Sequence, residues 1–456
     1  MTKPKGYTEL FKLGKIKVPH RKNTAKDPGM KMQPPKKIIL PMVQHIGAPA
    51  EPQVKVGDEV LVGTLIGKAA SYVSVNIHSP VSGKVVKIDR FLQSNGQSCA
   101  AVIIESDGNM TLDPSIKPPV VESFEDLSRA ALECGLAGLG GAGFPTHVKL
   151  DPKRVSDIDV ILLNGAECEP YITSDTRIML DRSADIKFGL EKIFSLSGIK
   201  RAIIGIEGNK PECVKHLSEV FSDDERVEVV SLPSKYPQGG EKVLIHNTTG
   251  RIVPEGGLPA DVGVIVMNVN TLATLAKYLK DGIPLIEKLV TVDGSAIKEP
   301  RNVFAPIGTP LSEVIEAAGG YKCDPGKVML GGPMMGVTVY SAEETPVMKN
   351  TNAITALSES DTVTKPRFEC VHCGRCVSAC PMGLNPPSFA RAMRIENKNE
   401  RIDALKEAKT NLCIECGCCS FICPSARPLV ENNRLAKAEL RAYMQEMARK
   451  EKEAKK

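Results

Sequence analysis

Residues 370–381 read Cys-Val-His-Cys-Gly-Arg-Cys-Val-Ser-Ala-Cys-Pro, and residues 413–424 repeat the same spacing as Cys-Ile-Glu-Cys-Gly-Cys-Cys-Ser-Phe-Ile-Cys-Pro. The 456-residue chain holds 14 cysteines, and its first 37 residues are basic and polar without the apolar core of a secretory signal. In such a chain, cysteines are expected to be reduced or bound to metal and not paired in disulfides. The repeat therefore predicts a metal-binding domain near the C-terminus.

The spacing is typical of proteins that bind two [4Fe–4S] clusters. The first three thiolates of a run wrap one cluster, and the fourth reaches over to the other cluster. The predicted ligand sets are Cys370, Cys373, Cys376 and Cys423 for one cluster, and Cys413, Cys416, Cys419 and Cys380 for its neighbour. Zinc is the alternative because it also accepts four thiolates, but zinc sites usually take their cysteines in pairs. We interpret Cys418, which lies off the spacing, as a neighbour of the cluster.

Residues 37–115 contain short apolar runs separated by glycine turns, which is the pattern of a small β-sandwich. The turn at Ser79–Gly83 resembles those of barrel-sandwich modules of the lipoyl and biotinyl kind. Lys68 lacks the flanking tripeptides that mark a lipoyl or biotin attachment site. We therefore interpret this module, with its His45 and His78, as structural.

Residues 120–288 alternate β-type runs with helical segments. The apolar runs Val160–Leu163, Ala202–Ile206 and Val262–Met267 are short and continuous. This alternation predicts a Rossmann-like α/β domain with a mainly parallel sheet. Ligands of such sheets bind at the carboxyl ends of the strands, where the following loops begin.

A glycine-rich loop, Gly135-Leu-Ala-Gly-Leu-Gly-Gly-Ala-Gly-Phe-Pro-Thr146, lies early in this domain. Glycines let the backbone approach a ring or a phosphate closely, with amide N–H groups facing the anion. Lys149 supplies a cation nearby, and further polar loops follow the β-type runs. The predicted cofactor-binding residues are Gly138, Gly140, Gly141, Gly143, Phe144, Lys149, Asn164, Glu167, Glu169, Tyr236, Gly240, Glu241, Asn268 and Thr271.

The remaining segments complete a multidomain organisation. Residues 289–345 form a smaller module, and a polar linker leads from it to the cysteine-rich domain at residues 360–430. Residues 1–36 are expected to form a basic arm with little to bury, and residues 431–456 a basic helix. The chain therefore contains four domains between two basic ends.

Charge is distributed unevenly along the chain. The formal net charge is +5, but residues 1–37 carry +9 and residues 434–456 carry +4, which leaves −8 for the body. Basic ends on an acidic body suggest docking to an acidic partner or a membrane surface, while two solvated tails are the alternative. No apolar run approaches the length that a bilayer requires. The absence of Trp and the 4% of aromatic residues argue against stacking platforms for single-stranded nucleic acid.

The polar loops of the α/β domain resemble those of the NADH- and FMN-binding flavoprotein subunit of respiratory complex I. The resemblance is carried by Gly140–Thr146 with Lys149, Asn164–Pro170, Tyr236–Glu241 and Asn268–Thr271. It implies that the glycine loop and the Asn164–Pro170 loop surround FMN, and that nicotinamide stacks on the flavin. We expect Glu167 and Glu169 to contact the nicotinamide or its ribose. Ala137 and Leu139 stand where that subunit usually has arginines, which affects the contact with dinucleotide phosphates.

The order of motifs along roughly residues 35–430 resembles the RnfC family, the C subunits of the Rnf ion-translocating electron-transport complexes. Its hallmarks are Gln44–Ala50, Asn164–Asp175, a soluble-ligand-binding β-grasp (SLBB) module near residues 290–340 and the paired ferredoxin motifs. The resemblance implies a multidomain α/β chain: a barrel-sandwich module, a Rossmann-like FMN/NADH domain, an SLBB module and a helical two-cluster ferredoxin domain. The implied cofactors are two [4Fe–4S] clusters and non-covalent FMN, with NAD(H) as substrate.

The resemblance also implies a ferredoxin:NAD⁺ oxidoreductase (translocase) complex, in which this chain exchanges hydride at FMN and passes single electrons through its clusters. The partners would be integral membrane subunits and an Fe–S subunit, without nucleic acid, at the cytoplasmic face of the bacterial cell membrane. No side chain is required as a general acid or base, so the catalytic residues are unassigned. Two alternatives remain: a cobalamin reductase of a bacterial microcompartment, and a non-catalytic Fe–S electron relay. The Gln44–Ala50 segment favours Rnf.

Overall fold

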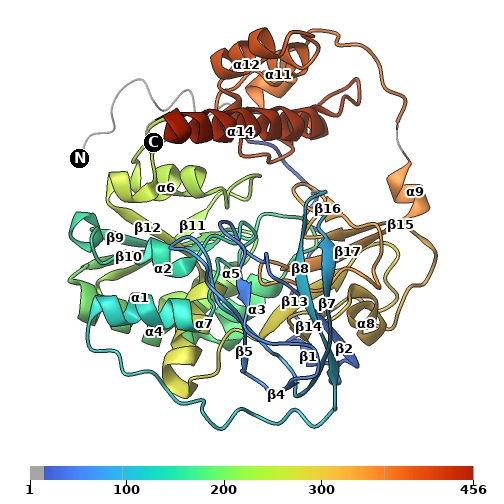
Figure 1. The fold of residues 1–456 in the computed structure, drawn as a ribbon. Coiled ribbons are helices and arrows are strands. Elements are labelled where there is room, and N and C mark those ends of the chain that lie inside the picture. The colour runs from blue at the N-terminus through green and yellow to red at the C-terminus, as the bar shows by residue number, and fades with distance from the viewer. Residues whose placement is uncertain (1–14, 95, 364, 455–456) are drawn as a thin grey trace. The chain divides into compact units, whose positions relative to one another are not determined.

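The computed structural model describes residues 15–94, 96–363 and 365–454 (Figure 1). The tip of the expected basic arm, residues 1–14, lies outside the described residues. The chain divides into two compact units. The larger, here called the main unit, contains residues 20–233 and 258–362. The smaller, here called the cysteine unit, contains the described residues up to Pro19, residues 234–257 and the described residues from Val363 onward.

The first domain of the main unit is an antiparallel β-sandwich, as expected from its short apolar runs. One sheet has the order β2 (Lys37–Pro41), β8 (Ser98–Ser106), β7 (Gly83–Leu92), β4 (Glu59–Val60), and the other the order β3 (Glu51–Pro52), β5 (Leu65–Lys68), β6 (Ile77–His78). Neighbouring strands pair antiparallel in both sheets. Ile38, Leu40, Ile66 and Ile104 are fully buried between the sheets. Burying such side chains stabilises the fold by about 1.5–3 kcal/mol each.

A four-stranded parallel sheet forms the second domain and confirms the Rossmann-like prediction. Its order is β11 (Val227–Leu232), β10 (Arg201–Glu207), β9 (Val160–Gly165), β12 (Val264–Asn268). All three pairings are parallel. The strand order reverses between β9 and β12, so the loops after these two strands meet at the position where ligands of such sheets bind.

Short helices and turns connect and cover this sheet. They are α1 (Phe124–Glu133), α2 (Thr146–Lys149), η2 (Val155–Asp157), α3 (Ser174–Asp181), α4 (Ser183–Ser197), α5 (Pro211–Val220), η3 (Pro259–Val262) and α7 (Val269–Asp281). Helix α4 packs against α7. The buried faces of these two helices, which include Ile186, Leu190 and Leu272, join the same core as the sandwich.

The third domain is a six-stranded mixed sheet with its own apolar core. Its order is β1 (Met30–Lys31), β14 (Arg301–Pro306), β13 (Glu287–Asp293), β17 (Ala353–Ser358), β15 (Pro325–Leu330), β16 (Val337–Thr338), with helices α8 (Leu311–Ala317) and α9 (Glu359–Thr362). Val290, Val303 and Val314 belong to the core of this sheet. The domain contains the smaller module expected at residues 289–345 but extends beyond it, because β17 pairs with both β13 and β15 in the stretch that was expected to be a polar linker.

The segment that precedes the sandwich differs from the expected arm with little to bury. Met30 pairs with Val303 of β14, and Thr24 is 2% exposed. The Lys22 amine donates to three backbone carbonyls of the main unit. The expectation was therefore wrong for residues 20–36. A basic composition does not prevent burial when carbonyl oxygens accept hydrogen bonds from the charged group.

Helices dominate the cysteine unit. They are α6 (Glu241–Thr249), α10 (Arg375–Ser378), α11 (Pro386–Ala392), α12 (Lys398–Glu407), η4 (Thr410–Leu412), α13 (Cys418–Phe421) and α14 (Leu429–Ala454). Helix α14 packs against α11 and α12, with Leu429, Ala436 and Leu440 buried. The first half of the expected basic helix is thus a structural part of the cysteine-rich domain.

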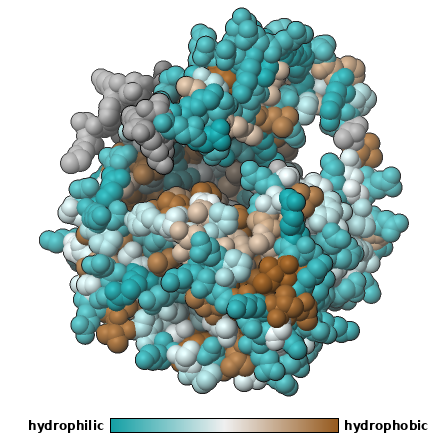
Figure 2. Space-filling view, in the orientation of Figure 1, coloured by the Kyte–Doolittle hydropathy of each residue, from teal (hydrophilic) through white to brown (hydrophobic). Residues whose placement is uncertain are grey.

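Among the described residues, no helix is long and apolar enough to cross a membrane. Helix α14 has 26 residues, but charged side chains are distributed along its length. Hydrophilic side chains cover α11 and α12 at the top of the space-filling view (Figure 2).

Candidate cofactor sites

The glycine loop of the main unit joins α1 to α2 and folds back on itself. The Gly138 N–H donates to the Phe144 carbonyl at 2.8 Å, which closes the loop. Gly141 and Gly143 have φ angles of 128° and 67°, values that side chains disfavour. A Cβ atom on Gly141 would meet no described atom within 4 Å, so the backbone of this residue is open to a ligand.

Two buried lysines hold the carbonyl groups of this loop. Lys288 on β13 donates to the Leu139 carbonyl at 2.7 Å, and Lys349 donates to the Gly135 carbonyl at 2.6 Å. Asn350 donates to the Gly141 carbonyl at 3.1 Å. With its carbonyls bound on the protein side, the loop can present N–H groups to an anion.

Burial disfavours the charged form of a lysine, and the pKa values of Lys288 and Lys349 are lowered for this reason. Lys349 is 1% exposed, and burial lowers its pKa to about 7. Burial also lowers the pKa of Lys288, while the nearby Asp175 opposes this shift. The pKa of Asp175 is raised, first by burial and then by Glu167. Neither lysine was predicted as a site residue, because a single lysine near a β-strand has no recognisable local signal.

The N-terminus of α7 lies directly beside the glycine loop. The Asn268 side chain accepts from the Asn270 and Thr271 N–H groups at 2.9 and 3.3 Å, and so caps the helix. Its amide donates to Asp175 at 2.7 Å, while the Leu139 N–H donates to the Thr271 hydroxyl at 3.0 Å. A Cβ atom on Gly140 would approach Asn268 to 3.0 Å. The structure therefore brings Gly140, Asn268 and Thr271 together at a helix N-terminus, which favours anions.

The loop after β9 uses its two predicted glutamates internally. The Glu167 carboxylate accepts from the Asp175 N–H at 2.6 Å and the Thr176 N–H at 3.3 Å, at the start of α3. The Glu169 carboxylate accepts from the Met334 and Met335 N–H groups at 3.1 and 2.7 Å. Both carboxylates that we expected to face nicotinamide or ribose thus bind backbone amides of the chain itself.

A second pair of lysines holds the carbonyls of the same loop. Lys22 donates to the Glu167 and Glu169 carbonyls at 2.8 Å each, and burial lowers its pKa to about 8. Lys210 donates to the Ala166 carbonyl at 2.9 Å. The N-terminal segment therefore supports the loop that follows β9.

Two further predicted residues of the α/β domain, Asn164 and Lys149, contact the backbone around its central strands. The Asn164 side chain accepts from the Ala166 N–H at 3.1 Å, which tightens the turn after β9. The Lys149 amine donates to the Val266 carbonyl of β12 at 3.0 Å and lies 6.0 Å from the centre of the Phe144 ring. The amine of Lys149 thus contacts the strand that leads to Asn268.

Tyr236, Gly240 and Glu241 belong to the cysteine unit. The Tyr236 hydroxyl donates to the Cys416 carbonyl at 2.7 Å, and its backbone pairs with Ile16. Gly240 precedes α6, and Glu241 is the first residue of that helix. The predicted Tyr236 loop is therefore tied to the second cysteine run.

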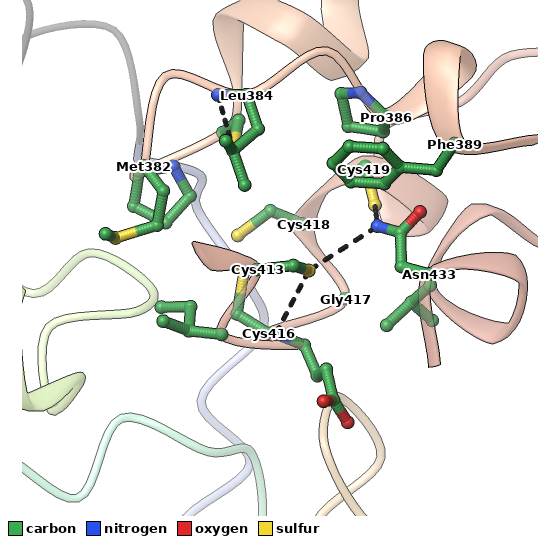
Figure 3. A pocket seen from close by; sticks show the side chains of 15 residues that line it. Met382, Leu384, Pro386, Phe389, Cys413, Cys416, Gly417, Cys418, Cys419 and Asn433 are labelled. Carbon is green, nitrogen blue, oxygen red and sulfur yellow. Dashed lines mark hydrogen bonds between the residues drawn. The ribbon is translucent and has the colours of Figure 1, made fainter. Parts of the chain in front are cut away.

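Cysteines from both runs line a single pocket in the cysteine unit (Figure 3). The four cysteines of one predicted ligand set, Cys380, Cys413, Cys416 and Cys419, line it together with Cys418. The Leu384 N–H donates to the Cys380 sulfur at 3.3 Å, and the Glu415 N–H donates to the Cys413 sulfur at 3.4 Å. Four cysteine sulfurs with N–H donors and apolar neighbours are a donor set that suits a [4Fe–4S] cluster.

The two cysteine runs share a backbone conformation. His372 and Glu415, which occupy equivalent positions, have φ angles of 53° and 57°, and Gly374 and Gly417 precede short helices with φ angles of 72° and 77°. Cys376 and Cys423 of the other ligand set pack against a small cluster formed by Cys419, Leu429 and Val430. Cys373 is exposed, whereas Cys416 and Cys419 are buried. The two predicted cluster positions thus differ in exposure to solvent.

Comparison with protein families assigns four domains to the chain. The matching models are described as an RnfC barrel-sandwich hybrid domain (residues 11–109), a Nuo51 FMN-binding domain (132–277), an SLBB domain (289–338) and a 4Fe-4S dicluster domain (362–424). The chain is 44% identical over 383 residues to the C subunit of the Na⁺-translocating ferredoxin:NAD⁺ oxidoreductase complex of Acetobacterium woodii, covering 83% of this chain and 86% of that protein. The chain belongs to the RnfC family.

Other RnfC relatives agree with this assignment. The C subunit of the proton-translocating ferredoxin:NAD⁺ oxidoreductase complex of Clostridium ljungdahlii is 43% identical, with 80% of each chain covered. The C subunit of the ion-translocating oxidoreductase complex of Rhodobacter capsulatus is 39% identical, with 78% of this chain and 69% of that protein covered. Among solved structures, an NAD⁺-reducing [NiFe]-hydrogenase matches 70% of this chain and 63% of its own, with a TM-score of 0.49 and 20% identity.

Membership of the RnfC family confirms the predicted architecture of barrel-sandwich, FMN-binding, SLBB and dicluster domains. It also confirms FMN and two [4Fe–4S] clusters as the cofactors. The relatives are subunits of oxidoreductase complexes, so this chain is a component of such a complex.

Proposed function

We propose that this chain is the peripheral subunit at which an ion-translocating ferredoxin:NAD⁺ oxidoreductase complex exchanges hydride with NAD(H). The observation that supports this most directly is the presence of an FMN-binding domain and a dicluster domain on one chain. Bound FMN converts between a two-electron hydride and single electrons, and [4Fe–4S] clusters carry electrons one at a time. The protein's own role is to bind, orient and tune these groups.

The FMN phosphate would lie against the glycine loop and the N-terminus of α7. Lys288 and Lys349 hold loop carbonyls away from this side, and Thr271 fixes the Leu139 N–H. The negative phosphate would then meet amide N–H groups and the positive end of a helix. In the main unit, we propose cofactor contacts at Gly138, Gly140, Gly141, Gly143, Phe144, Lys149, Asn164, Glu167, Glu169, Asn268 and Thr271. Tyr236, Gly240 and Glu241 belong to the cysteine unit, and their contact with a cofactor stays a prediction from the sequence.

The cysteine unit would hold the clusters with the two interlaced ligand sets. Cys413, Cys416, Cys419 and Cys380 would hold one cluster, and Cys370, Cys373, Cys376 and Cys423 the other. The shared pocket around Cys380 and Cys413 supports the first set. The packing of Cys376 and Cys423 against the same small cluster of Cys419, Leu429 and Val430 supports the second. Interlacing keeps the clusters close enough for electron transfer between them.

The proposed location is the cytoplasmic face of a bacterial cell membrane, bound to integral membrane subunits and an Fe–S subunit of the complex. Relatives named as subunits of ion-translocating complexes support this. Among the described residues, no helix can cross a membrane, so attachment would be through partner subunits or charged surfaces.

Anaerobic purification with flavin and iron analysis, followed by an NADH-to-viologen assay, tests this proposal. We expect about one FMN and about eight irons per chain, and reduction of viologen by NADH. A purified protein that contains iron but no flavin, and that does not oxidise NADH, would contradict the proposal. It would support a non-catalytic electron relay. Co-purification with membrane subunits distinguishes the Rnf assignment from a cobalamin reductase.

A further inference from the structure

The long C-terminal helix α14 carries an asparagine into the cysteine pocket. Asn433 is 2% exposed, and its Nδ2 lies 3.6 Å from the Cys413 sulfur and 3.9 Å from the Cys419 sulfur (Figure 3). Both distances suit hydrogen bonds from an amide to sulfur. Asn433 is thus a buried side-chain donor that contacts two of the four cysteines in this pocket.

Helix α14 holds this asparagine in place through contacts with the second cysteine run. Lys437 donates to the Cys413 carbonyl at 2.7 Å and pairs with the Glu415 carboxylate at 2.7 Å. Arg434 also approaches Glu415, at 3.5 Å. One turn before Asn433, Leu429 and Val430 are buried against Cys419. The helix therefore cannot turn Asn433 away from the pocket without breaking several contacts.

The first cysteine run has no equivalent donor at the corresponding position of the sequence. Asn433 lies ten residues after Cys423, and the residue ten positions after Cys380 is Ala390. The repeated backbone conformation of the two runs makes these positions comparable. The side-chain donor is thus specific to one half of the repeat and does not follow from cluster binding as such.

We propose that Asn433 is a positioning residue that raises the reduction potential of the cluster held by Cys413, Cys416, Cys419 and Cys380. This inference rests on the ligand set given under Proposed function. When the cluster accepts one electron, its sulfurs become more negative, and an N–H donor stabilises the reduced form more than the oxidised form. No bond to a ligand forms or breaks, and the amide keeps its protons.

The surroundings of this pocket explain why such hydrogen bonds matter. Cys416 and Cys419 are buried among apolar side chains such as Phe389. Burial by itself disfavours the more negative, reduced cluster and so lowers the potential. Asn433 offsets this effect and keeps the buried cluster reducible.

The test is an anaerobic redox titration of the full chain, followed by electron paramagnetic resonance, for wild type and Asn433→Leu. Leucine has a similar size but donates no hydrogen bond. We expect the ratio of reduced to oxidised cluster, at a given applied potential, to fall about tenfold for one of the two clusters. For one electron this corresponds to a reduction potential that is lower by about 59 mV. The other cluster's signal serves as an internal reference and should not move. Asn432→Leu is the matched control, because the neighbouring asparagine is half-buried and is expected to leave both potentials unchanged.

The outcomes separate the inference from the function on which it rests. Wild-type chain without iron–sulfur clusters would overturn the proposed function. An Asn433→Leu chain with about eight irons and unchanged potentials would overturn the inference alone. If Asn433→Leu loses iron, Asn433→Met decides, since its flexible, uncharged side chain fills the space but donates no hydrogen bond. Its cluster should have a potential lower than wild type, and an equal or higher potential would contradict the proposal.

Discussion

Buried lysines are the individual side chains on which the candidate FMN site depends most. Lys349 is 1% exposed and donates to the carbonyls of Gly135 and Asn76, which lie more than 200 residues away in the sequence. A buried ammonium group is costly unless hydrogen bonds satisfy it, so these contacts stabilise both the lysine and the loop.

Lys349→Met is expected to weaken the glycine loop. The substitution removes the amine that donates to the Gly135 carbonyl, so this carbonyl loses the hydrogen bond from Lys349. The free energy of unfolding should fall by about 1–3 kcal/mol, and FMN retention on gel filtration should fall with it. Lys327→Met on β15 is the control, because that lysine is exposed. Normal flavin content and stability in Lys349→Met would contradict the supporting role.

A buried histidine of the β-sandwich is expected to make the free energy of unfolding depend on pH. Burial, and then the charge of Lys349, lowers the pKa of His78 to about 3, from an ordinary value of 6.5. Between these two pKa values the unfolded chain binds a proton that the folded chain does not, so stability is present above pH 6.5 and is lost as the pH falls below it. From about pH 7 to about pH 5 the contribution of this residue to the free energy of unfolding should decrease by about 2 kcal/mol.

Urea denaturation at about pH 7 and about pH 5, followed by circular dichroism, measures this effect. His78→Gln cannot titrate in this range and should lose less stability than wild type between the two pH values. His216→Gln, which removes a half-buried histidine of α5, should behave as wild type does. Equal acid sensitivity of wild type and His78→Gln would show that His78 is not held neutral by burial.

At the scale of single elements, the N-terminus of α7 depends on one side chain that makes two kinds of hydrogen bond. Asn268 caps the helix through its oxygen and donates to the buried Asp175 through its nitrogen. Asn268→Ala should therefore cost about 1–2 kcal/mol for the cap and leave Asp175 without this donor. Thermal unfolding and FMN content of the variant measure both losses. Asn268→Ser keeps a capping oxygen and should lose less, while equal stability of all three proteins would contradict the role of the cap.

Helix α14 divides into a packed half and a solvent-exposed half. Among the side chains of this helix that the structure describes, the buried ones are Leu429, Val430, Asn433, Ala436 and Leu440, all in the first half. A chain that ends at Gln445 should retain its iron, because it loses only exposed contacts such as the Lys398–Glu446 ion pair. A chain that ends at Pro428 should lose about half of its iron, since the pocket around Cys380 and Cys413 loses the lining residues Val430 and Asn433. Iron analysis after anaerobic purification measures both, and full iron without α14 would contradict this assignment.

At the scale of the whole molecule, the two units depend on cofactors to different degrees. The main unit has a large apolar core that joins the sandwich and the α/β domain. The small cores of the cysteine unit include the cysteines themselves, among them Cys376, Cys413 and Cys419. Metal binding is therefore expected to supply much of the folding free energy of the cysteine unit.

Removal of iron should accordingly unfold one unit only. In hydrogen exchange, amides of α11 and α14 are expected to lose protection in the iron-free chain, while those of β9 and β10 keep it. Cys418→Ser, which changes the cysteine outside the spacing, should retain its iron and serves as the control. Equal protection of α14 with and without iron would contradict this dependence.

Patterns that are complete within a short stretch of chain were readable from the sequence. The repeated cysteine spacing predicted the two clusters, and the alternation of β-type runs with helices predicted the α/β domain, because each pattern reflects a local backbone geometry. FMN and the full domain order were implied by the resemblance of the motifs to known families. Lys22, Lys288 and Lys349 could not be found in this way, since each is satisfied by carbonyls from distant segments. The same holds for the packing of residues 20–36 on the main unit, since Met30 and Lys31 pair with β14 and Thr24 is buried.

Only the tertiary structure showed which polar side chains are already hydrogen-bonded within the protein. Glu167 and Glu169 stand where a ligand contact was expected, yet both carboxylates accept backbone N–H groups. Asn433 has no motif, and only the packing of α14 brings its amide to the sulfurs of Cys413 and Cys419. The physical reason is the same in each case: local spacing determines which groups can bind a cofactor, whereas the hydrogen bonds that satisfy and tune buried groups come from residues far apart in the chain.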